Sequence, residues 1–323
     1  MTAPEPLSYA AAGVDVAAYD RLLERVRPLL TATHGPEVAA GIGPFAGLYT
    51  LPGGGRLAVS ADGVGTKIKV AVAAGRHRGI GHDLVNHCVN DIATAGARPL
   101  FLLDYFATGR LHEDVFTEVV AGLAEACRAS GCALLGGETA EMPGMYALGD
   151  YDLAGFAVGL VDRDVRREPV AAGDLLLGLP SSGLHTNGYS LARRVFEDVS
   201  LDHVFPELGR PLGDVLLEPH RSYLERLRAP GWKAAAHVTG GGLLGNVPRA
   251  MPEGLCAELQ RAAWEVPPIF ELIARLGRVA DEEMLATFNM GLGMVLVAPE
   301  PLPGLPVVGR VVERRGAHRV LVR

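Results

Sequence analysis

The chain has 323 residues, a length that predicts two domains of ordinary size. Its 37 acidic and 30 basic residues give a formal charge of −7 at pH 7, and neither sign is concentrated in one run. Nucleic acid and anionic membranes normally bind a clustered basic face, so this composition argues against both as partners. Apolar residues make up 49% of the chain, which argues against disorder and allows a sizeable core.

The cysteines and the N-terminal segment predict a cytoplasmic protein. The four cysteines are Cys88, Cys127, Cys132 and Cys256. They form no Cys-x-x-Cys pair and no zinc cluster with histidine, so we expect reduced thiols in the core. The N-terminal segment carries Glu5 and Asp15 and lacks the apolar core of a signal peptide. No apolar run reaches the roughly 18 residues that a membrane-spanning helix needs.

Helical and strand patterns alternate in the first half of the chain. Apolar residues from Val16 to Leu30 recur at helical spacing after Asp15, a candidate N-cap, whereas the glycine- and proline-rich stretch 35–55 is expected to be irregular. Strands are then predicted over 57–61, 100–106, 133–136 and 151–161, and helices over 84–95 and 115–127.

A mostly charged segment, 162–168, precedes Pro169 and is interpreted as the linker between a domain of residues 1–165 and one of residues 166–323. Beyond it, strands are predicted over 175–179, 294–298, 307–312 and 319–322, and helices over 189–196, 221–228, 243–249, 269–276 and 282–288. Strands and helices alternate in both halves, which predicts two mixed α/β domains but not their strand order.

The first chemically informative motif, Ser-Ala-Asp-Gly-Val-Gly-Thr-Lys over 60–67, follows a predicted strand. Asp62 offers a carboxylate suited to Mg²⁺, and the glycine-rich backbone of 63–66 together with Lys67 suits phosphate oxygens. The order of residues is not that of a P-loop. The alternative is an ordinary glycine turn that carries a surface aspartate and lysine.

A second motif places Asp91 on a predicted helix that ends at Gly96, before Pro99. One interpretation is that Asp91 and Asp62 share metal ions that bridge the phosphates of a nucleotide. The other is that Asp91 is solvated and Gly96 is an ordinary helix cap.

The sequence Gly-Gly-Glu-Thr-Ala-Glu-Met-Pro-Gly over 136–144 is expected to form a loop after a strand. Glu138 and Glu141 are candidates to hold metal, orient water or bind an amine. Solvated loop charges are the alternative, which is preferred for Glu141 taken by itself.

Two motifs of the second half link a strand to a helix through small and polar residues. Ser182, His185 and Asn187 lie in the first, and Gly240, Gly241 and Gly242 follow His237 in the second. Glycine-rich entries to helices bind anions through free N–H groups, which fits a phosphorylated substrate. Either histidine, taken alone, is more often an ordinary core or surface residue.

In this order and at these separations, the motifs closely resemble those of the phosphoribosylformylglycinamidine cyclo-ligase (aminoimidazole ribonucleotide synthetase) family. The likeness extends from Leu7 to Met294 and beyond, and its most specific part is the string Gly-Gly-Glu-Thr-Ala-Glu-Met-Pro-Gly-Met-Tyr that begins at Gly136. Ala61 and Thr186 depart from residues common in the family, but neither removes a carboxylate, lysine or glycine of the motifs.

The resemblance implies a homodimer in which the N-terminal sheets of two subunits form a β-barrel, with ATP near that barrel and the C-terminal α/β domain closing the site. By position it implies Asp62, Asp91 and Glu138 as Mg²⁺ ligands. Nucleotide contacts are implied for Gly63, Val64, Gly65, Thr66, Lys67, Gly137, Glu138 and Thr139. Substrate contacts are implied for Ser182, His185, Asn187, Gly240, Gly241 and Gly242, and His237 is left without a role.

The implied reaction is the ATP-dependent ring closure of formylglycinamidine ribonucleotide to 5-aminoimidazole ribonucleotide in purine biosynthesis, with release of ADP and phosphate. Phosphorylation of the formamide oxygen gives an iminophosphate, whose carbon the amidine nitrogen attacks. His185 and Glu141 are candidate general bases, and Lys67 is a further candidate catalytic residue. The alternatives are another ATP-dependent kinase or synthetase of the superfamily and a non-catalytic nucleotide-binding scaffold.

Overall fold

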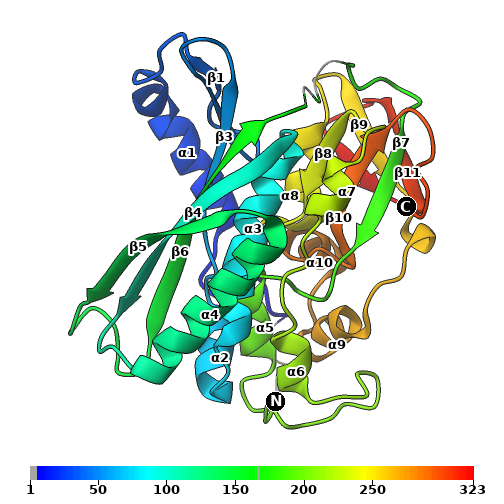
Figure 1. Ribbon diagram of the computed structural model, residues 1–323. Helices are drawn as coiled ribbons and strands as arrows, with labels where there is room; N and C mark the ends of the chain where they lie inside the picture. The colour runs from blue at the N-terminus through cyan, green and yellow to red at the C-terminus, as the bar shows by residue number, and fades with distance from the viewer. Residues whose placement is uncertain (1–5, 164, 166–167) are drawn as a thin grey trace.

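Two six-stranded sheets, one from each half of the chain, form the framework of the molecule (Figure 1). The computed structural model describes residues 6–163, 165 and 168–323. The strands of the first sheet are β1 (Val38–Ala40), β2 (Gly47–Thr50), β3 (Arg56–Gly63), β4 (Ala97–Thr108), β5 (Ala133–Glu141) and β6 (Tyr151–Val161). Those of the second are β7 (Leu175–Pro180), β8 (Ala234–His237), β9 (Leu255–Leu259), β10 (Leu292–Ala298), β11 (Val307–Glu313) and β12 (Val320–Val322).

Both sheets are mixed, with mostly antiparallel neighbours. The strand order is β1-β2-β3-β6-β4-β5 in the first sheet and β12-β9-β11-β7-β10-β8 in the second. Two pairs are parallel, β4 with β5 and β9 with β12. The predicted fold class, two mixed α/β (α+β) units, is therefore confirmed. The strand order could not be predicted from local sequence patterns.

The helices cover these sheets and connect their strands. In the first half they are α1 (Val16–Thr31), α2 (Lys67–Ala74), α3 (Arg78–Thr94) and α4 (Glu113–Ser130). In the second half they are α5 (Tyr189–Val195), α6 (Leu212–Leu216), α7 (Leu224–Arg228), α8 (Gly242–Asn246), α9 (Pro268–Gly277) and α10 (Asp281–Thr287), with 3₁₀ turns at Val247–Ala250 and Arg261–Ala263. Within the described ranges no helix is both long and apolar enough to cross a membrane.

Helix α3 lies between the two halves and is buried along most of its length (Figure 1). Its apolar side, with Ile80, Leu84 and Cys88, packs on β3 and β6 of the first sheet. Its other side is polar and equally buried, because α7 and β8 of the second half cover it. Buried polar side chains need hydrogen-bond partners, and those that α3 finds create the site described below.

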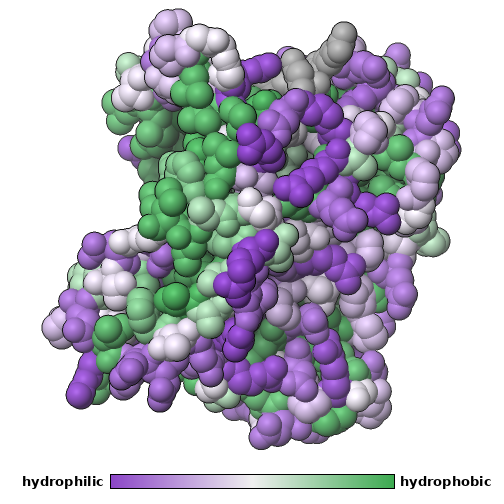
Figure 2. Space-filling view, viewed as in Figure 1, coloured by the Kyte–Doolittle hydropathy of each residue, from purple (hydrophilic) through white to green (hydrophobic). Residues whose placement is uncertain are grey.

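The face of the first sheet that turns away from α3 carries exposed apolar side chains. Leu103 and Tyr105 of β4 are each 38% exposed, and Phe156 of β6 is 42% exposed. Their neighbours in sequence, such as Leu102 and Phe106, point to the opposite face and are buried. Figure 2 shows a hydrophobic band over this part of the molecule. An apolar face of this kind is typical of a surface that a partner covers.

Most predicted elements are present, with β6 at its predicted bounds and α1 beginning after Asp15, whose carboxylate accepts a hydrogen bond from the Ala18 N–H at 2.8 Å. The predicted loop over 136–144 is wrong in its first part, because β5 continues to Glu141. Gly137 permits this extension, since a Cβ there would lie 2.0 Å from the carbonyl oxygen of Asp104 on β4.

Other differences lie where local patterns are weak. The stretch 35–55, expected to be irregular, contains β1 and β2, and α7 begins at Leu224 rather than at 221. The alanine-rich β8 was not predicted, because it lacks the branched side chains that mark strands and is held by pairing with β10. Positions 164, 166 and 167 of the predicted linker lie outside the described residues.

Candidate active site

The polar side of α3 presents five side chains, each of which lies three or four residues from at least one other, and this spacing places them on one helix face. They are Asp83, His87, Asn90, Asp91 and Thr94, and none is more than 9% exposed. The interpretation of Asp91 as a solvated surface residue is therefore wrong. A row of buried polar groups between two halves of a chain is costly unless each finds a partner across the interface.

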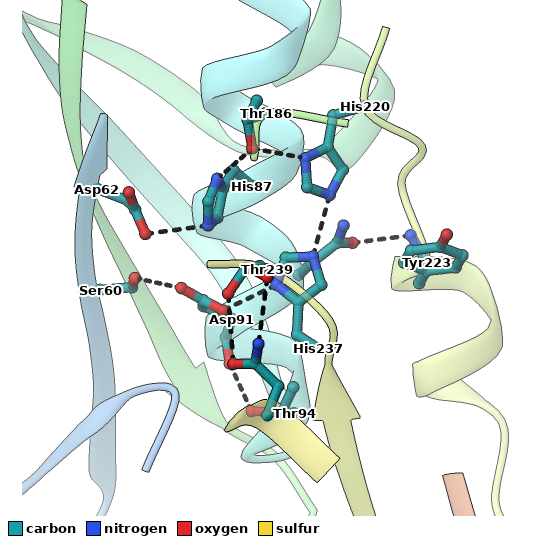
Figure 3. Close-up of polar contacts among 12 residues, drawn as sticks. Ser60, Asp62, His87, Asp91, Thr94, Thr186, His220, Tyr223, His237 and Thr239 are labelled. Carbon is teal, nitrogen blue, oxygen red and sulfur yellow. Dashed lines mark hydrogen bonds and ion pairs between the residues drawn. The ribbon is translucent and has the colours of Figure 1, made fainter. Parts of the chain in front are cut away.

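Asp62 and His87 begin a chain of polar contacts that crosses this interface (Figure 3). A carboxylate oxygen of Asp62, near the end of β3, lies 2.9 Å from Nε2 of His87. Nδ1 of His87 lies 2.9 Å from the hydroxyl of Thr186, which lies 3.4 Å from Nδ1 of His220. Thr186 and His220 belong to the second half of the chain.

The chain of contacts continues back to the first half. Nε2 of His220 lies 3.0 Å from Nε2 of His237, and Nδ1 of His237 lies 2.8 Å from Oδ1 of Asp91. The hydroxyl of Ser60 donates to the other oxygen of Asp91 at 3.0 Å. The structure thus brings Asp62 and Asp91 into one cluster, joined by three imidazoles and one hydroxyl (Figure 3).

The positive charge of this cluster lies on His87. Burial by itself lowers the pKa of His87, but the Asp62 carboxylate raises it to about 9. Burial by itself raises the pKa of Asp62, yet the charge and hydrogen bond of His87 outweigh burial and lower it. Burial lowers the pKa of His220 and that of His237. Asp91 raises the pKa of His237, but not enough to offset its burial. A cationic imidazole therefore lies beside neutral ones.

Lys67, a predicted nucleotide contact, is buried in an ion pair. Its side chain has no exposed surface, and Nζ lies 2.9 Å from Oδ1 of Asp83. Nζ also donates to the carbonyl oxygen of Glu218 at 2.7 Å. In this arrangement the ammonium group binds protein atoms, and it is not presented to solvent.

The turn 63–66 follows β3, as the motif predicted, and leads into α2, a helix that was not predicted. Gly65 has φ +71°, a conformation that favours glycine, and Val64 is buried. The exposed Thr66 hydroxyl lies 3.2 Å from that of Ser190, which lies in the first turn of α5, at the end of the first polar motif of the second half. The two motifs therefore adjoin across the interface.

His185, in the first polar motif of the second half, has a buried side chain. Its backbone has φ +63°, and its Nε2 accepts a hydrogen bond from the Ser182 N–H at 3.1 Å. Its ring stacks on that of His220 with 4.1 Å between centroids, and its Nδ1 has no hydrogen-bond partner among the described residues. The Ser182 hydroxyl donates to the carbonyl oxygen of Pro219.

The three consecutive glycines form a tight turn held from beneath. Asn246 donates to the carbonyl oxygens of Thr239, Gly240 and Gly242 at 2.9–3.2 Å. A Cβ at Gly242 would lie 2.3 Å from the carbonyl oxygen of Leu285, so this position requires glycine. The side chain of Asn187 approaches Gly240, which places the two polar motifs of the second half side by side.

Glu138 does not join the cluster within one chain. Tyr105 is its register partner, so Glu138 points to the face that turns away from α3, whereas Asp62 points toward α3. Strands β6 and β4 also separate β3 from β5, a distance of roughly 14 Å at 4.8 Å per strand. Thr139 and Glu141 follow on β5, and Glu141 accepts a hydrogen bond from the Leu111 N–H at 2.8 Å.

Comparison with known proteins decides the family. Residues 43–161 match the family described as AIR synthase related protein, N-terminal domain, and residues 171–318 match its C-terminal domain. A phosphoribosylformylglycinamidine cyclo-ligase of Myxococcus xanthus is 55% identical over 90% of this chain and 88% of its own length. One of Nitrosospira multiformis is 52% identical over 91% and 87%. The chain belongs to the phosphoribosylformylglycinamidine cyclo-ligase family.

Solved structures with similar folds are more distant in sequence. A thiamine monophosphate kinase from Aquifex aeolicus superposes with a TM-score of 0.64 at 17% identity, over 94% of this chain and 96% of that one. The hydrogenase maturation protein HypE in complex with ATP gives a TM-score of 0.60 at 19% identity, over 94% and 91%. These structures support the fold alone.

The predicted site residues of this cyclo-ligase family member did not include the three histidines of the cluster, His87, His220 and His237, or its two hydroxyl residues, Ser60 and Thr186. His87 had a usable signal, because it lies four residues before Asp91 and therefore on the same helix face. No sequence signal pointed to His220, because it lies in an irregular segment. Asp83 and Asn86 of α3 hold this segment by hydrogen bonds to the backbone of His220. His237, left without a role, lies between His220 and Asp91.

Proposed function

We propose that the polar cluster between the two halves is where this cyclo-ligase carries out its reaction. Family membership gives the reaction itself: ATP-dependent ring closure of formylglycinamidine ribonucleotide to 5-aminoimidazole ribonucleotide, with release of ADP and phosphate. The observation that carries the location is the convergence of Asp62 and Asp91, from different elements, on His87 and His237. We also retain 1–165 and 166–323 as the two domains, the first of which supplies both carboxylates.

Mg²⁺ fits the two carboxylates at the edge of the cluster. Asp62 has a side chain that is 40% exposed, so it is accessible to a cation that arrives with a nucleotide. Asp91 offers carboxylate oxygens that at present accept hydrogen bonds from Ser60 and His237. Oxygen ligands of this kind are those that Mg²⁺ prefers. When bound, Mg²⁺ neutralises charge on the phosphates of ATP.

The chemical difficulty is that a formamide oxygen is a poor leaving group. Its phosphorylation by ATP makes an iminophosphate, whose carbon the amidine nitrogen attacks with expulsion of phosphate. The protein then acts mainly by positioning and by charge. We assign the backbone of 63–66, with Gly137 and Thr139, to the nucleotide. Lys67 acts there only if its buried ion pair with Asp83 opens.

The substrate contacts are assigned to the adjoining polar motifs of the second half. Ser182 and Asn187, with the glycine turn 240–242, would hold the ribose phosphate and the amidine. Support comes from the proximity of the Asn187 side chain to Gly240 and from the contact of Thr66 with Ser190, which together bring these motifs next to the turn after Asp62.

The general base remains a choice between His185 and Glu141. His185 is closer to the cluster, because its ring stacks on that of His220, but Nε2 is occupied by the Ser182 N–H. Glu141 is exposed but lies at the end of β5, beyond Glu138. An alanine variant at either position with unchanged kcat would remove that residue from consideration.

A second copy of the chain is proposed to cover the exposed face of the first sheet, as in the dimeric β-barrel that the family resemblance implies. The apolar residues Leu103, Tyr105 and Phe156 support this assignment. Glu138 lies on that face as well, so its assignment to metal or nucleotide depends on the dimer. We retain the cytoplasm as the compartment, on the basis of the four free cysteines.

The experiment is an ADP-release assay with and without formylglycinamidine ribonucleotide. We expect release to depend strictly on this substrate and to be nearly abolished in Asp91→Asn, while Asp162→Asn, a surface carboxylate paired with Arg98, behaves like the parent. Release driven by thiamine phosphate or selenide instead would favour another kinase or synthetase of the superfamily. ATP binding without turnover under any of these conditions would favour a scaffold.

A further inference from the structure

One ligand atom from each of His87, Asp91 and His237 lies within 4.8 Å of the other two. His87 and Asp91 are four residues apart on α3, and His237 ends β8 opposite them. Ligand atoms around a tetrahedral metal with bonds of about 2.0 Å are roughly 3.3 Å apart. The separation of 2.8 Å between His237 Nδ1 and Asp91 Oδ1 is therefore already close to the edge of such a tetrahedron.

Each of the three groups is also held by its other polar atom. Nδ1 of His87 contacts Thr186 at 2.9 Å, Nε2 of His237 contacts His220 at 3.0 Å, and Oδ2 of Asp91 accepts from Ser60 at 3.0 Å. The atoms that would face a cation are then His87 Nε2, His237 Nδ1 and Asp91 Oδ1, which now pair with Asp62 in the first case and with each other in the other two. Outer partners that fix the orientation of imidazole and carboxylate ligands are a usual part of protein metal sites.

We propose that His87, Asp91 and His237 form a binding site for a divalent cation of the borderline class, such as Zn²⁺ or Co²⁺. Asp62 lies beside it, with a carboxylate oxygen 2.9 Å from His87 Nε2, and offers a fourth ligand together with partial exposure to solvent. Two carboxylates balance the charge of one divalent ion, which is what a buried cation requires. The ion takes the place of two protons, the one between His237 Nδ1 and Asp91 Oδ1 and the one that the cationic His87 carries on Nε2 toward Asp62.

The ligand types select the metal. Imidazole nitrogen suits Zn²⁺, Co²⁺, Ni²⁺ and Cu²⁺, whereas Mg²⁺ prefers oxygen ligands and keeps several waters. This site and a Mg²⁺–ATP site share Asp91, so a borderline ion bound here withdraws that carboxylate from the nucleotide and inhibits turnover. The inhibition rests on the proposed function, but the binding does not.

The test uses the full-length protein after treatment with a chelator, with Zn²⁺ titrated in competition with a chromophoric indicator. We expect one Zn²⁺ per chain and at least a tenfold loss of affinity in His87→Ala and in His237→Ala. His82→Ala is the matched control, because His82 also pairs with a carboxylate, Glu125, but on the surface of α3 and α4. No stoichiometric binding to the parent, or equal affinity in all variants, would overturn the proposal.

Two further measurements protect the test against misfolded variants and against failure of the proposed function. His87→Asn keeps more of the side-chain volume and must lose affinity as well. Co²⁺ bound to the parent protein must give the intense visible absorption of a four- or five-coordinate ion, and the weak absorption of an octahedral ion would contradict the site. Zn²⁺ binding is measured without substrates, so an inactive Asp91→Asn and an absent Zn²⁺ site are separate results.

Discussion

Lys67 and Asp83 form a buried ion pair that also fastens the second half of the chain. Nζ of Lys67 lies 2.9 Å from Oδ1 of Asp83, and neither side chain has exposed surface. Each partner also binds the backbone of the same irregular segment: Nζ donates to the Glu218 carbonyl oxygen, and Oδ1 accepts from the His220 N–H, each at 2.7 Å. Burial lowers the pKa of Lys67 and raises that of Asp83, effects that their pairing opposes. The pair therefore helps to hold His220 in the cluster.

Replacement of Lys67 by methionine should destabilise the protein. Asp83 would keep a buried charge without its partner, a change that costs about 3–5 kcal/mol in other proteins. Urea unfolding measures the loss, and Lys69→Met is the control, because Lys69 forms a pair with Asp150 at the surface. Lys67→Met combined with Asp83→Leu should recover much of the stability.

The same variant separates the two interpretations of Lys67. If unfolding of Lys67→Met matches the parent while the KM for ATP rises, Lys67 contacts nucleotide as the sequence motif suggested. If stability falls as described, its first role is to join the two halves.

Asn90 should matter more for stability than its neighbour Asn86. The amide of Asn90 donates to the Arg221 carbonyl oxygen at 2.9 Å and accepts from the Tyr223 N–H at 2.8 Å, whereas Asn86 makes one such bond, to the His220 carbonyl oxygen. Each buried backbone group left unpaired costs about 1–3 kcal/mol. Urea unfolding should therefore give a loss in Asn90→Ala about twice that in Asn86→Ala. Equal losses would mean that water replaces the asparagine at both positions.

These contacts show which features of the fold could not be predicted from the sequence. Helical spacing predicted α1, α3 and α4 because their apolar faces repeat every three or four residues. The helix predicted to begin at 221 starts three residues later, because Asn90 binds the backbone of Arg221 and Tyr223 from more than a hundred residues away. A local sequence pattern cannot show that a distant side chain binds backbone groups that would otherwise join the helix.

Prediction of the site was limited in the same way. The acidic type and the position of Asp62 and Asp91 after strand and glycine signals indicated that they would meet, and the structure brings them into one cluster. Lys67 followed a glycine turn, which suggested phosphate, but its buried partner Asp83 lies on another helix. Residue type indicates what a side chain can bind, whereas its partner is decided by the packing of distant elements.

Glu125 links α4 to α3 at the surface and should give a pH-dependent contribution to stability. Hydrogen bonds from Arg78 and then from His82 lower its pKa from 4.5 to about 2. A carboxylate whose pKa is lower in the folded state stabilises fully above its unfolded pKa, and the effect is lost as the pH falls toward the folded value. The Tm of Glu125→Gln should therefore lie slightly below that of the parent at pH 7, and the difference should shrink between pH 4.5 and 2. A difference that grows on acidification would contradict the pairing.

A charge on the exposed face of the first sheet should separate two copies of the chain. Phe156 is 42% exposed in the middle of that face, and Leu103 lies opposite it on the neighbouring strand. Phe156→Glu would place a carboxylate in the apolar interface of the proposed dimer, where burial of an unpaired charge costs several kcal/mol. Sedimentation velocity should then show a monomer for this variant and a dimer for the parent. Leu276→Glu is the control, because Leu276 is 41% exposed on α9 of the second half and lies outside this sheet. A dimer that survives Phe156→Glu but dissociates in Leu276→Glu would move the interface to the second half.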